Sequence, residues 1–121
     1  MTHLATTNSA LVRQFLDHAL AGRTDAALEL VDRNHVEHSL TIPAGRDGVA
    51  EFLNGVAANR DQMRVTVHRM IADEQHVVVQ LETDWAHDNR RTMAVDIFRL
   101  EDGRIVEHWD VVQPLPAQPT A

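Results

Sequence analysis

Residues 91–114 constrain the fold of this chain more than any other segment. They read RTMAVDIFRLEDGRIVEHWDVVQP, in which two runs of alternating apolar and polar side chains flank a short acidic stretch that ends in glycine. This is the pattern of a β-hairpin. The segment therefore predicts two antiparallel strands joined by a tight turn.

The loop of this hairpin decides which side chains share a face. We expect a three-residue loop over residues 101–103, with Gly103 left-handed and forming a bulge, so that Asp96 pairs with His108. A two-residue Asp-Gly turn is the alternative, and it would shift the pairing by one residue and separate Asp96 from Asp110. We favour the longer loop because it gathers three titratable groups on one otherwise apolar face. The opposite face then carries Val95, Ile97, Trp109 and Val111.

Composition limits the classes of protein to consider. A chain of 121 residues with 44% hydrophobic content predicts one domain over residues 1–121, with residues 1–7 and 115–121 as frayed tails. The net charge of −7, without a basic run, argues against nucleic acid or a membrane as a partner. Cysteine is absent, no apolar run suits a membrane span, and residues 1–9 do not resemble a signal peptide. We therefore expect a cytoplasmic protein.

Helical periodicity dominates the N-terminal half. Apolar residues recur at helical spacing over residues 8–20, 24–31 and 48–59, with Thr24 and Asp47 suited to cap the second and third segments. Residues 32–45 lose this periodicity. We expect them to cross the domain as an irregular segment with room for one short strand.

The period becomes alternating after Arg60. Residues 63–71 and 76–85 predict two strands with a turn between them, and residues 86–90 form a polar loop into the hairpin. Three helices followed by four antiparallel strands predict an α+β domain, in which a curved sheet wraps around the helices and leaves a cavity on its concave face. The polar residues expected in this cavity are Gln80, Glu82, Asp96, His108 and Asp110, with His38 or Glu37 at its mouth.

Two motifs carry a resemblance to a known family. The run DIFRLEDGRIVEHWDVVQP at residues 96–114 resembles the closing hairpin of SnoaL-like proteins, which are small members of the nuclear transport factor 2-like superfamily. Glu37-His38 followed by Gly-Arg-Asp-Gly at residues 45–48 resembles their other signature. The resemblance covers nearly the whole chain and implies a cone-shaped fold with three N-terminal helices packed in a curved antiparallel sheet. It also points to a homodimer.

The same resemblance implies a small-molecule enzyme. In the polyketide cyclases of this family, an aspartate at the position of Asp110 is the general acid/base of an intramolecular aldol condensation, whereas Asp96 and Ala94 here replace a histidine and a glutamine. In limonene-epoxide hydrolase-like relatives the last-strand aspartate again matches Asp110. Their Arg-x-Asp motif falls on residues 80–82, where only the carboxylate is retained. Aldol cyclase, isomerase and epoxide hydrolase chemistry are all compatible with the fold.

Asp110 is the predicted general acid/base. It lies between Trp109 and Val111, so partial desolvation should raise its pKa and suit it to transfer a proton near neutral pH. A purely structural hydrogen-bond acceptor is the alternative. Asp96 is expected either to orient His108 as a carboxylate–imidazole pair or to share a proton with Asp110. The residues predicted to contact substrate are His38, Glu37, Gln80, Glu82, Phe98 and Trp85.

Neither a metal nor a cofactor is expected. The run HVEH at residues 35–38 places two histidines three residues apart, but no further ligand is spaced to complete a site. There is no glycine-rich phosphate loop and no Gly-x-Ser-x-Gly elbow.

Two functions of different class fit these patterns. The first is an enzyme that performs acid/base chemistry on a small apolar carbonyl or epoxide compound, in a homodimer formed through the outer face of the sheet. The second is a non-catalytic domain that binds a small molecule or serves as a dimeric scaffold. The clustered titratable groups favour the enzyme, because a scaffold gains nothing from their desolvation. A cavity plugged by Phe98, Trp85 and Met93 would favour the scaffold.

Overall fold

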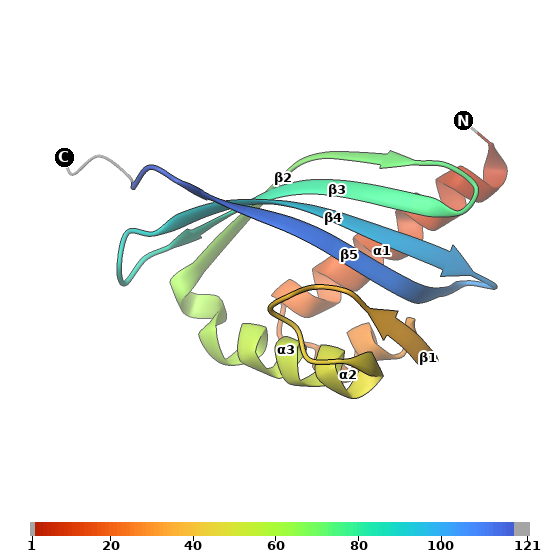
Figure 1. Ribbon diagram of the computed structural model, residues 1–121, viewed down its shortest axis with the longest axis horizontal. Helices are drawn as coiled ribbons and strands as arrows, with labels where there is room; N and C mark the ends of the chain where they lie inside the picture. The colour runs from red at the N-terminus through yellow and green to blue at the C-terminus, as the bar shows by residue number, and fades with distance from the viewer. Residues whose placement is uncertain (1, 118–121) are drawn as a thin grey trace.

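The computed structural model describes residues 2–117, in which the helices and strands follow the change of periodicity (Figure 1). The helices are α1 (His3–Leu20), α2 (Thr24–Leu28) and α3 (Gly45–Asn59), with a short 3-10 helix η1 (Arg60–Gln62) after the last. The strands are β1 (Val31–Glu37), β2 (Met63–Ala72), β3 (His76–Trp85), β4 (Arg91–Glu101) and β5 (Arg104–Leu115). Among residues 2–117, no helix combines the length and apolar character needed to cross a membrane.

Helix α1 begins at His3 rather than at Asn8, because Thr2 caps it. The Thr2 hydroxyl accepts a hydrogen bond from the Ala5 backbone N–H at 3.1 Å. Asn8 consequently lies within the helix, buried, and its side-chain amide donates to the carbonyls of Asp73 and Glu74 at 3.3 and 3.1 Å. These bonds join α1 to the turn between β2 and β3.

The second predicted helix is shorter than expected. Helix α2 ends at Leu28, and Val31, expected as its last inward residue, begins β1 instead. Two arginines from distant segments donate hydrogen bonds to backbone carbonyls at the end of the helix. Arg46 donates to Leu28 O at 2.9 Å, and Arg104 donates to Glu29 O at 2.8 Å. Cations suit a helix C-terminus, so these contacts stabilise the end of α2 at Leu28.

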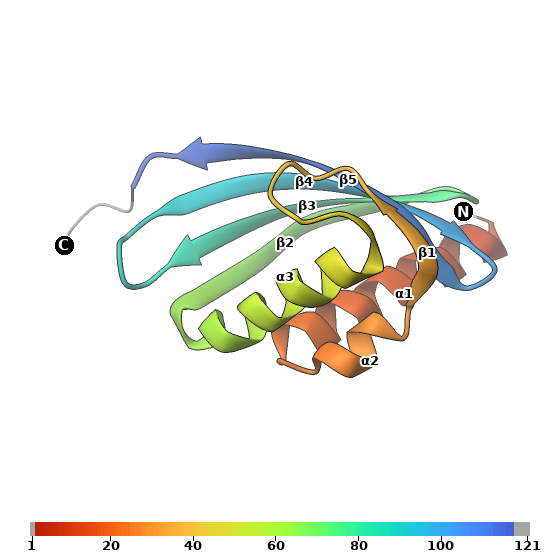
Figure 2. The same cartoon turned by 60° about the horizontal axis from the view of Figure 1, so that its bottom comes forward.

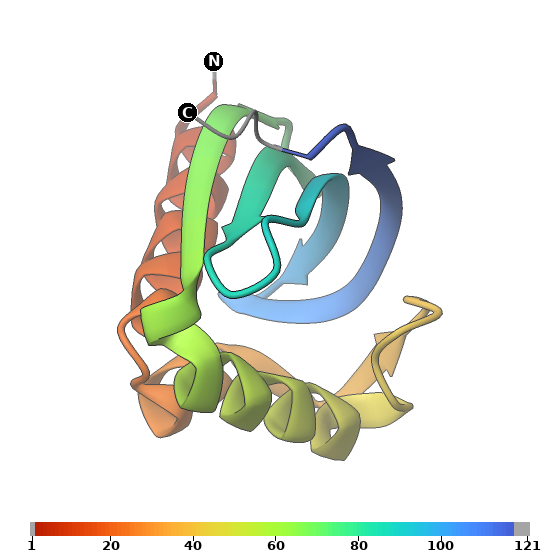
Figure 3. The same cartoon turned by 90° about the vertical axis from the view of Figure 1, so that its left-hand side faces the viewer.

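The sheet has five strands, because the short strand for which residues 32–45 had room is present as β1 and joins the four expected strands, in parallel rather than antiparallel pairing. Its order is β1-β5-β4-β3-β2, with β1 parallel to β5 and the other neighbours antiparallel. The strands arch over the side on which α1 and α3 lie (Figure 2), and a view along the strands shows both helices on one side of the twisted sheet (Figure 3). The core between these layers includes Val12, Phe15, Leu16, Val49, Leu53, Val77, Val79, Phe98, Leu100 and Ile105.

Helix α3 begins at Gly45, before the expected cap Asp47. The loop from β1 into α3 folds back over the first turn of the helix (Figure 2). A Cβ atom on Gly48 would lie 1.7 Å from the Pro43 carbonyl oxygen, so only glycine allows this approach. Glycine at this position therefore allows the path taken by the loop that carries Ser39.

The hairpin turn is the two-residue one, so the expected three-residue loop is wrong. Asp102 and Gly103 both have positive φ, 51° and 75°, as an Asp-Gly type I′ turn requires. The expected partner of Asp96 is wrong as well. A bulge on β5 follows the turn, and beyond it Asp96 pairs with Asp110 and not with His108.

The predicted face is nevertheless correct. The shorter turn shifts the pairing by one residue and the bulge shifts it by one more, and two such shifts restore the original alternation. Asp96, His108 and Asp110 therefore share one face of the hairpin. The same face carries Phe98, whose ring lies 5.9 Å from that of Phe15 in the core.

Candidate functional site

A group of polar side chains meets on the helix-facing side of the sheet, where β1, β5 and β4 are neighbours. Strand pairing sets Glu37 opposite His108, and Asp96 opposite Asp110. Ser39, just after β1, reaches Asp110 from the next position on the same side. We call these five residues the carboxylate–histidine cluster.

His108 lies at the centre of the carboxylate–histidine cluster. Its Nδ1 lies 2.6 Å from Glu37 Oε2, and its Nε2 lies 2.7 Å from Asp96 Oδ1. Carboxylate oxygens only accept, so both ring nitrogens donate and the ring is an imidazolium. Burial lowers the pKa of His108, but the hydrogen bonds and charges of the two carboxylates outweigh it and raise the pKa to about 9.

Glu37 is a buried carboxylate with both oxygens occupied. Oε1 lies 3.0 Å from His35 Nε2, and Oε2 accepts from the Ser39 backbone N–H at 3.0 Å as well as from His108. Burial raises the pKa of Glu37, but the hydrogen bonds from His108 and His35 outweigh it and lower the pKa to about 2. Glu37 was predicted to contact substrate at the mouth of the cavity. The structure places it behind His108 instead.

Asp110 is half-buried, as Asp96 is. Its Oδ2 accepts a hydrogen bond from the Ser39 hydroxyl at 2.9 Å, and the Thr41 backbone N–H donates to the same hydroxyl at 3.3 Å. Within residues 2–117, Oδ1 of Asp110 and Oδ2 of Asp96 make no hydrogen bond. Burial raises the pKa of Asp110, and the charge of Asp96 raises it further, while the bond from Ser39 works against them. The expected direction of the Asp110 shift is confirmed.

The cluster does not suit a metal ion. One ligand atom from each of Asp96, His108 and Asp110 lies within 4.8 Å of the others. A histidine binds a metal through an unprotonated nitrogen, yet both nitrogens of His108 donate to carboxylates. Two carboxylates without the imidazole make a weak site.

Gln80 and Glu82 were predicted to lie in the cavity, and this is wrong. Val79 is the β3 partner of Asp96, so Gln80 and Glu82 project from the opposite side of the sheet. Glu82 there accepts from Arg91 at 2.9 Å and lies 3.1 Å from His68 Nε2. Strict alternation identifies two faces of a strand but does not say which is buried, and in β3 the valine-rich face packs on the helices.

His38 also lies on the outer face, not at the mouth of the cavity. Its ring stacks on Trp109 with centroids 5.0 Å apart and 7° between planes, and its Nε2 lies 2.6 Å from Glu107 Oε2. Because Glu37 points inward, its neighbour His38 must point outward.

The two aromatic residues predicted to contact substrate lie apart. Phe98 is buried beside the cluster, with its ring 4.9 Å from that of His108. Trp85 lies at the end of β3, where the Arg90 guanidinium sits 4.6 Å from its ring centre. Six residues of strand, about 20 Å, separate Trp85 from the β3 position next to Asp96.

Sequence reasoning missed Ser39 and His35. Both are buried, and both lie on the side of β1 that carries Glu37. The spacing His35, Glu37, Ser39 has the period of two expected of one strand face. That spacing is visible in the sequence, but His35 and His38 in the same segment also have the spacing of a metal-binding pair, which favours a different interpretation.

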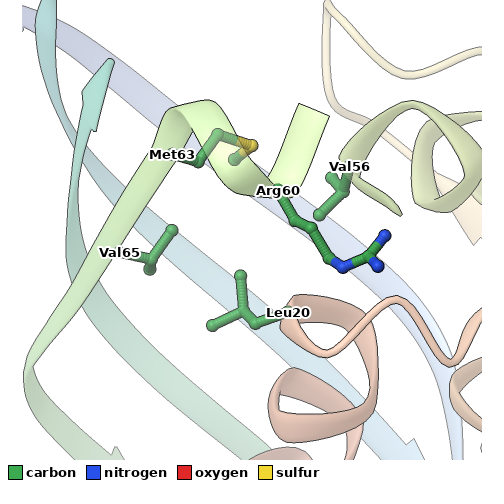
Figure 4. A pocket seen from close by; sticks show the side chains of 5 residues that line it. All are labelled: Leu20, Val56, Arg60, Met63 and Val65. Atoms are coloured by element: carbon green, nitrogen blue, oxygen red, sulfur yellow. The ribbon is translucent and has the colours of Figure 1, made fainter. Parts of the chain in front are cut away.

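Two hollows lie elsewhere on the protein. One, of about 140 Å³, is lined by Leu20, Val56, Arg60, Met63 and Val65 (Figure 4). The other, of about 250 Å³, is lined by Val31, Asp32, Arg33, Arg46 and Arg104. Arg46 and Arg104 already hold backbone carbonyls at the end of α2, which accounts for their presence there. Neither hollow is lined by a member of the cluster.

Comparison with solved structures identifies the fold. An NTF2-like protein of unknown function from Mesorhizobium loti is 21% identical, with a TM-score of 0.80 over 93% of this chain and 96% of that chain. A Kribbella flavida protein with a proposed ketosteroid isomerase activity is 18% identical, with a TM-score of 0.78 over 97% of this chain and 85% of that chain. An LEH-like epoxide hydrolase from M. tuberculosis is 20% identical, with a TM-score of 0.69 over 90% of this chain and 84% of that chain. These likenesses establish an NTF2-like fold.

No curated protein matches the chain in sequence. The SnoaL-like domain family does match it, over residues 12–108, a segment that includes α2, α3, β1 to β4 and the histidine of the cluster. The protein therefore belongs to the SnoaL-like domain family.

Proposed function

We propose that this SnoaL-like protein is an enzyme that transfers protons on a small, mostly apolar carbonyl or epoxide compound without a cofactor, with Asp110 as the general acid/base. The proposal rests on the hydrogen bonding and the burial of the Asp110 carboxyl group. Ser39 holds one oxygen, the other is unpartnered within residues 2–117, and the pKa of the group is raised by burial. A carboxylate with a raised pKa and an unoccupied oxygen can accept a proton from a bound molecule and return it.

The other members of the cluster have supporting roles in this proposal. Asp96 presents a second carboxylate close to Asp110, and its charge raises the proton affinity of Asp110. His108 has no nitrogen free for substrate, so it orients Asp96 and balances its charge. Proton transfer by one positioned group contributes about 10²–10⁴-fold to a rate.

The reaction types considered share one step. An aldol cyclase or an isomerase removes a proton next to a carbonyl, and an epoxide hydrolase removes one from water, so each needs a general base, a role that a carboxylate with a raised pKa can fill. The named activities of the Kribbella flavida and M. tuberculosis structures belong to this range and support the proposal at the level of the shared fold.

A second candidate is a non-catalytic binding domain or dimeric scaffold. Two observations favour it: the two hollows described above avoid the cluster, and the outer face exposes Val111, which is 71% accessible. In this case the buried charges of the cluster would serve the structure alone.

The test begins with a thermal-shift screen of small carbonyl and epoxide compounds, because a compound that binds the native state raises the melting temperature. Turnover of each compound found is then measured in the Asp110→Asn variant. We expect a folded protein with a melting temperature equal to or slightly above that of the wild type, since the variant removes a partly buried charge. Turnover should fall by about 10²–10⁴-fold.

Asp84→Asn is the matched control, because Asp84 lies on the outer face and bonds to Arg91 at 3.3 Å. It should retain full turnover. A folded Asp110→Asn protein with unchanged turnover excludes Asp110 as the acid/base. A loss of folding in Asp110→Asn alone favours the scaffold.

A further inference from the structure

A line of buried hydrogen bonds continues from the cluster into β1. His35 Nε2 lies 3.0 Å from Glu37 Oε1, and Glu37 Oε2 lies 2.6 Å from His108 Nδ1. From His108 the line ends at Asp96 Oδ1, 2.7 Å from Nε2. The proposed reaction uses only Asp96 and His108 from this line. It assigns no role to Glu37 and His35, which lie on β1.

The protons of this line can be placed from the donors and acceptors. His35 must donate from Nε2, because a carboxylate has no proton to give, and its Nδ1 is buried without a partner among residues 2–117. His108 donates from both of its ring nitrogens, so it is the cation of the line, with a carboxylate on each side.

Glu37 is the group that makes the cation possible. It accepts three N–H groups, from His35, His108 and the Ser39 backbone. A glutamine in its place would offer one accepting oxygen and an NH₂ group, and that NH₂ group would face a donor. The charged groups that face His108 are Glu37 from β1, Asp96 from β4 and Asp110 from its own strand, and only the first two bond to it.

We propose that Glu37 is a positioning residue: it keeps His108 protonated and fixes the orientation of its ring between β1 and β4, so that His108 binds Oδ1 of Asp96 and leaves Oδ2 without a hydrogen bond. The effect on His108 stands on the geometry alone. The effect on turnover rests on the proposed function. Glu37 touches no reacting atom, since both of its oxygens are occupied and its side chain is fully buried.

The first measurement is the titration of His108 by long-range ¹H–¹⁵N NMR of the imidazole rings, which reports protonation and tautomer at each nitrogen. In the wild type we expect His108 to carry both protons at pH 7, with a midpoint near the pKa of about 9. Glu37→Gln should lower that midpoint by about 1–3 pH units, because one of two adjacent charges is lost.

Glu107→Gln is the matched control. Glu107 precedes His108 on β5 and lies on the outer face, where its Oε2 is 2.6 Å from His38 Nε2. It should leave the His108 midpoint unchanged. An unchanged midpoint in Glu37→Gln, or an equal fall in Glu107→Gln, overturns the proposal.

Glu37→Asp keeps the negative charge but shortens the side chain, so it distinguishes the effect of charge from that of shape. It also replaces Glu37→Gln in the test if that variant is too unstable to study. If the charge is what matters, His108 stays doubly protonated at pH 7 in Glu37→Asp. A neutral His108 in this variant overturns the proposal, because it shows that only the shape of glutamate is required.

The second measurement is turnover of a compound found in the screen. Glu37→Gln should lower kcat by about tenfold or more while leaving KM within twofold, and Glu37→Asp should restore part of kcat. A shifted titration with unchanged kcat overturns the positioning role and leaves the proposed function intact. Unchanged turnover in Asp110→Asn overturns the proposed function and leaves the His108 titration to be judged by itself.

Discussion

The two faces of strand β5 carry the same pair of residue types in opposite surroundings. On the inner face His108 lies 2.6 Å from Glu37, and on the outer face His38 lies 2.6 Å from Glu107. The inner side chains are 7% and 1% exposed, and the outer ones are 39% and 20% exposed. The two pairs therefore have equal distances but should contribute unequally to the free energy of unfolding, because water screens the outer pair and not the inner one.

The surroundings of each pair extend the contrast. His108 has a second carboxylate, Asp96, on its other nitrogen, so its charge is enclosed on both sides. His38 instead lies flat on Trp109, a contact that favours a planar ring whatever its charge. The inner histidine is an electrostatic element of the cluster, and the outer one is a surface contact.

Removal of each histidine should give the largest difference. His108→Ala leaves Glu37 and Asp96 as buried carboxylates without a cation, which should cost about 3–5 kcal/mol of unfolding free energy. His38→Ala breaks an exposed pair and should cost at most about 1 kcal/mol. Urea unfolding of both variants at pH 7 measures the two values. Equal losses would show that burial does not separate the two pairs.

The pH dependence of stability should reflect the inner pair. The pKa of His108 is raised from 6.5 to about 9, so its contribution is complete below pH 6.5 and is lost as the pH rises through 9. The pKa of Glu37 is lowered from 4.5 to about 2, so its contribution is complete above pH 4.5 and is lost as the pH falls through 2. The pair should stabilise the fold most between pH 4.5 and 6.5.

Urea unfolding from pH 3 to pH 10 checks this profile. Glu37→Gln should reduce both limbs. Glu107→Gln on the outer face should leave the alkaline limb in place and lower only the acid limb, because the hydrogen bonds of Arg99 and His38 also lower the pKa of Glu107. A wild-type protein whose stability does not fall between about pH 7 and pH 10 would contradict the protonated state of His108.

The outer face should also differ in oligomer formation. We expect a homodimer through Val95, Ile97, Trp109 and Val111, because a contiguous apolar patch on a sheet is usually an interface. Val111→Glu, or Trp109→Glu, should then give the mass of a monomer in light scattering at micromolar concentration. Val112→Glu, the adjacent exposed valine on the inner face, should leave a dimer. A wild-type monomer would exclude the interface.

The smallest expected effect is that of metal removal. Since both nitrogens of His108 donate to carboxylates, treatment with a chelator should leave the melting temperature unchanged. A fall of several degrees that zinc reverses would show that the inner face holds a metal ion after all.

The inner face was only partly predictable. Asp96, His108 and Asp110 could be assigned to one face because alternation along a hairpin survives a turn and a bulge that each shift the pairing by one residue. Gln80 and Glu82 could not be assigned, because an alternating strand looks the same from either side. Packing of Val77 and Val79 on the helices decided that question.

Local pattern by itself determined the three helices and the four antiparallel strands that follow them, the bounds of β3, and the shared face of the three titratable residues in the hairpin. These features depend on neighbours in sequence, through side-chain period and turn chemistry. The tertiary structure alone decided that Glu37 joins His108. Their strands pair in parallel across a long stretch of chain, and no local signal in either strand specifies a partner at that distance. The charge of His108, and with it the character of the site, follows from that pairing.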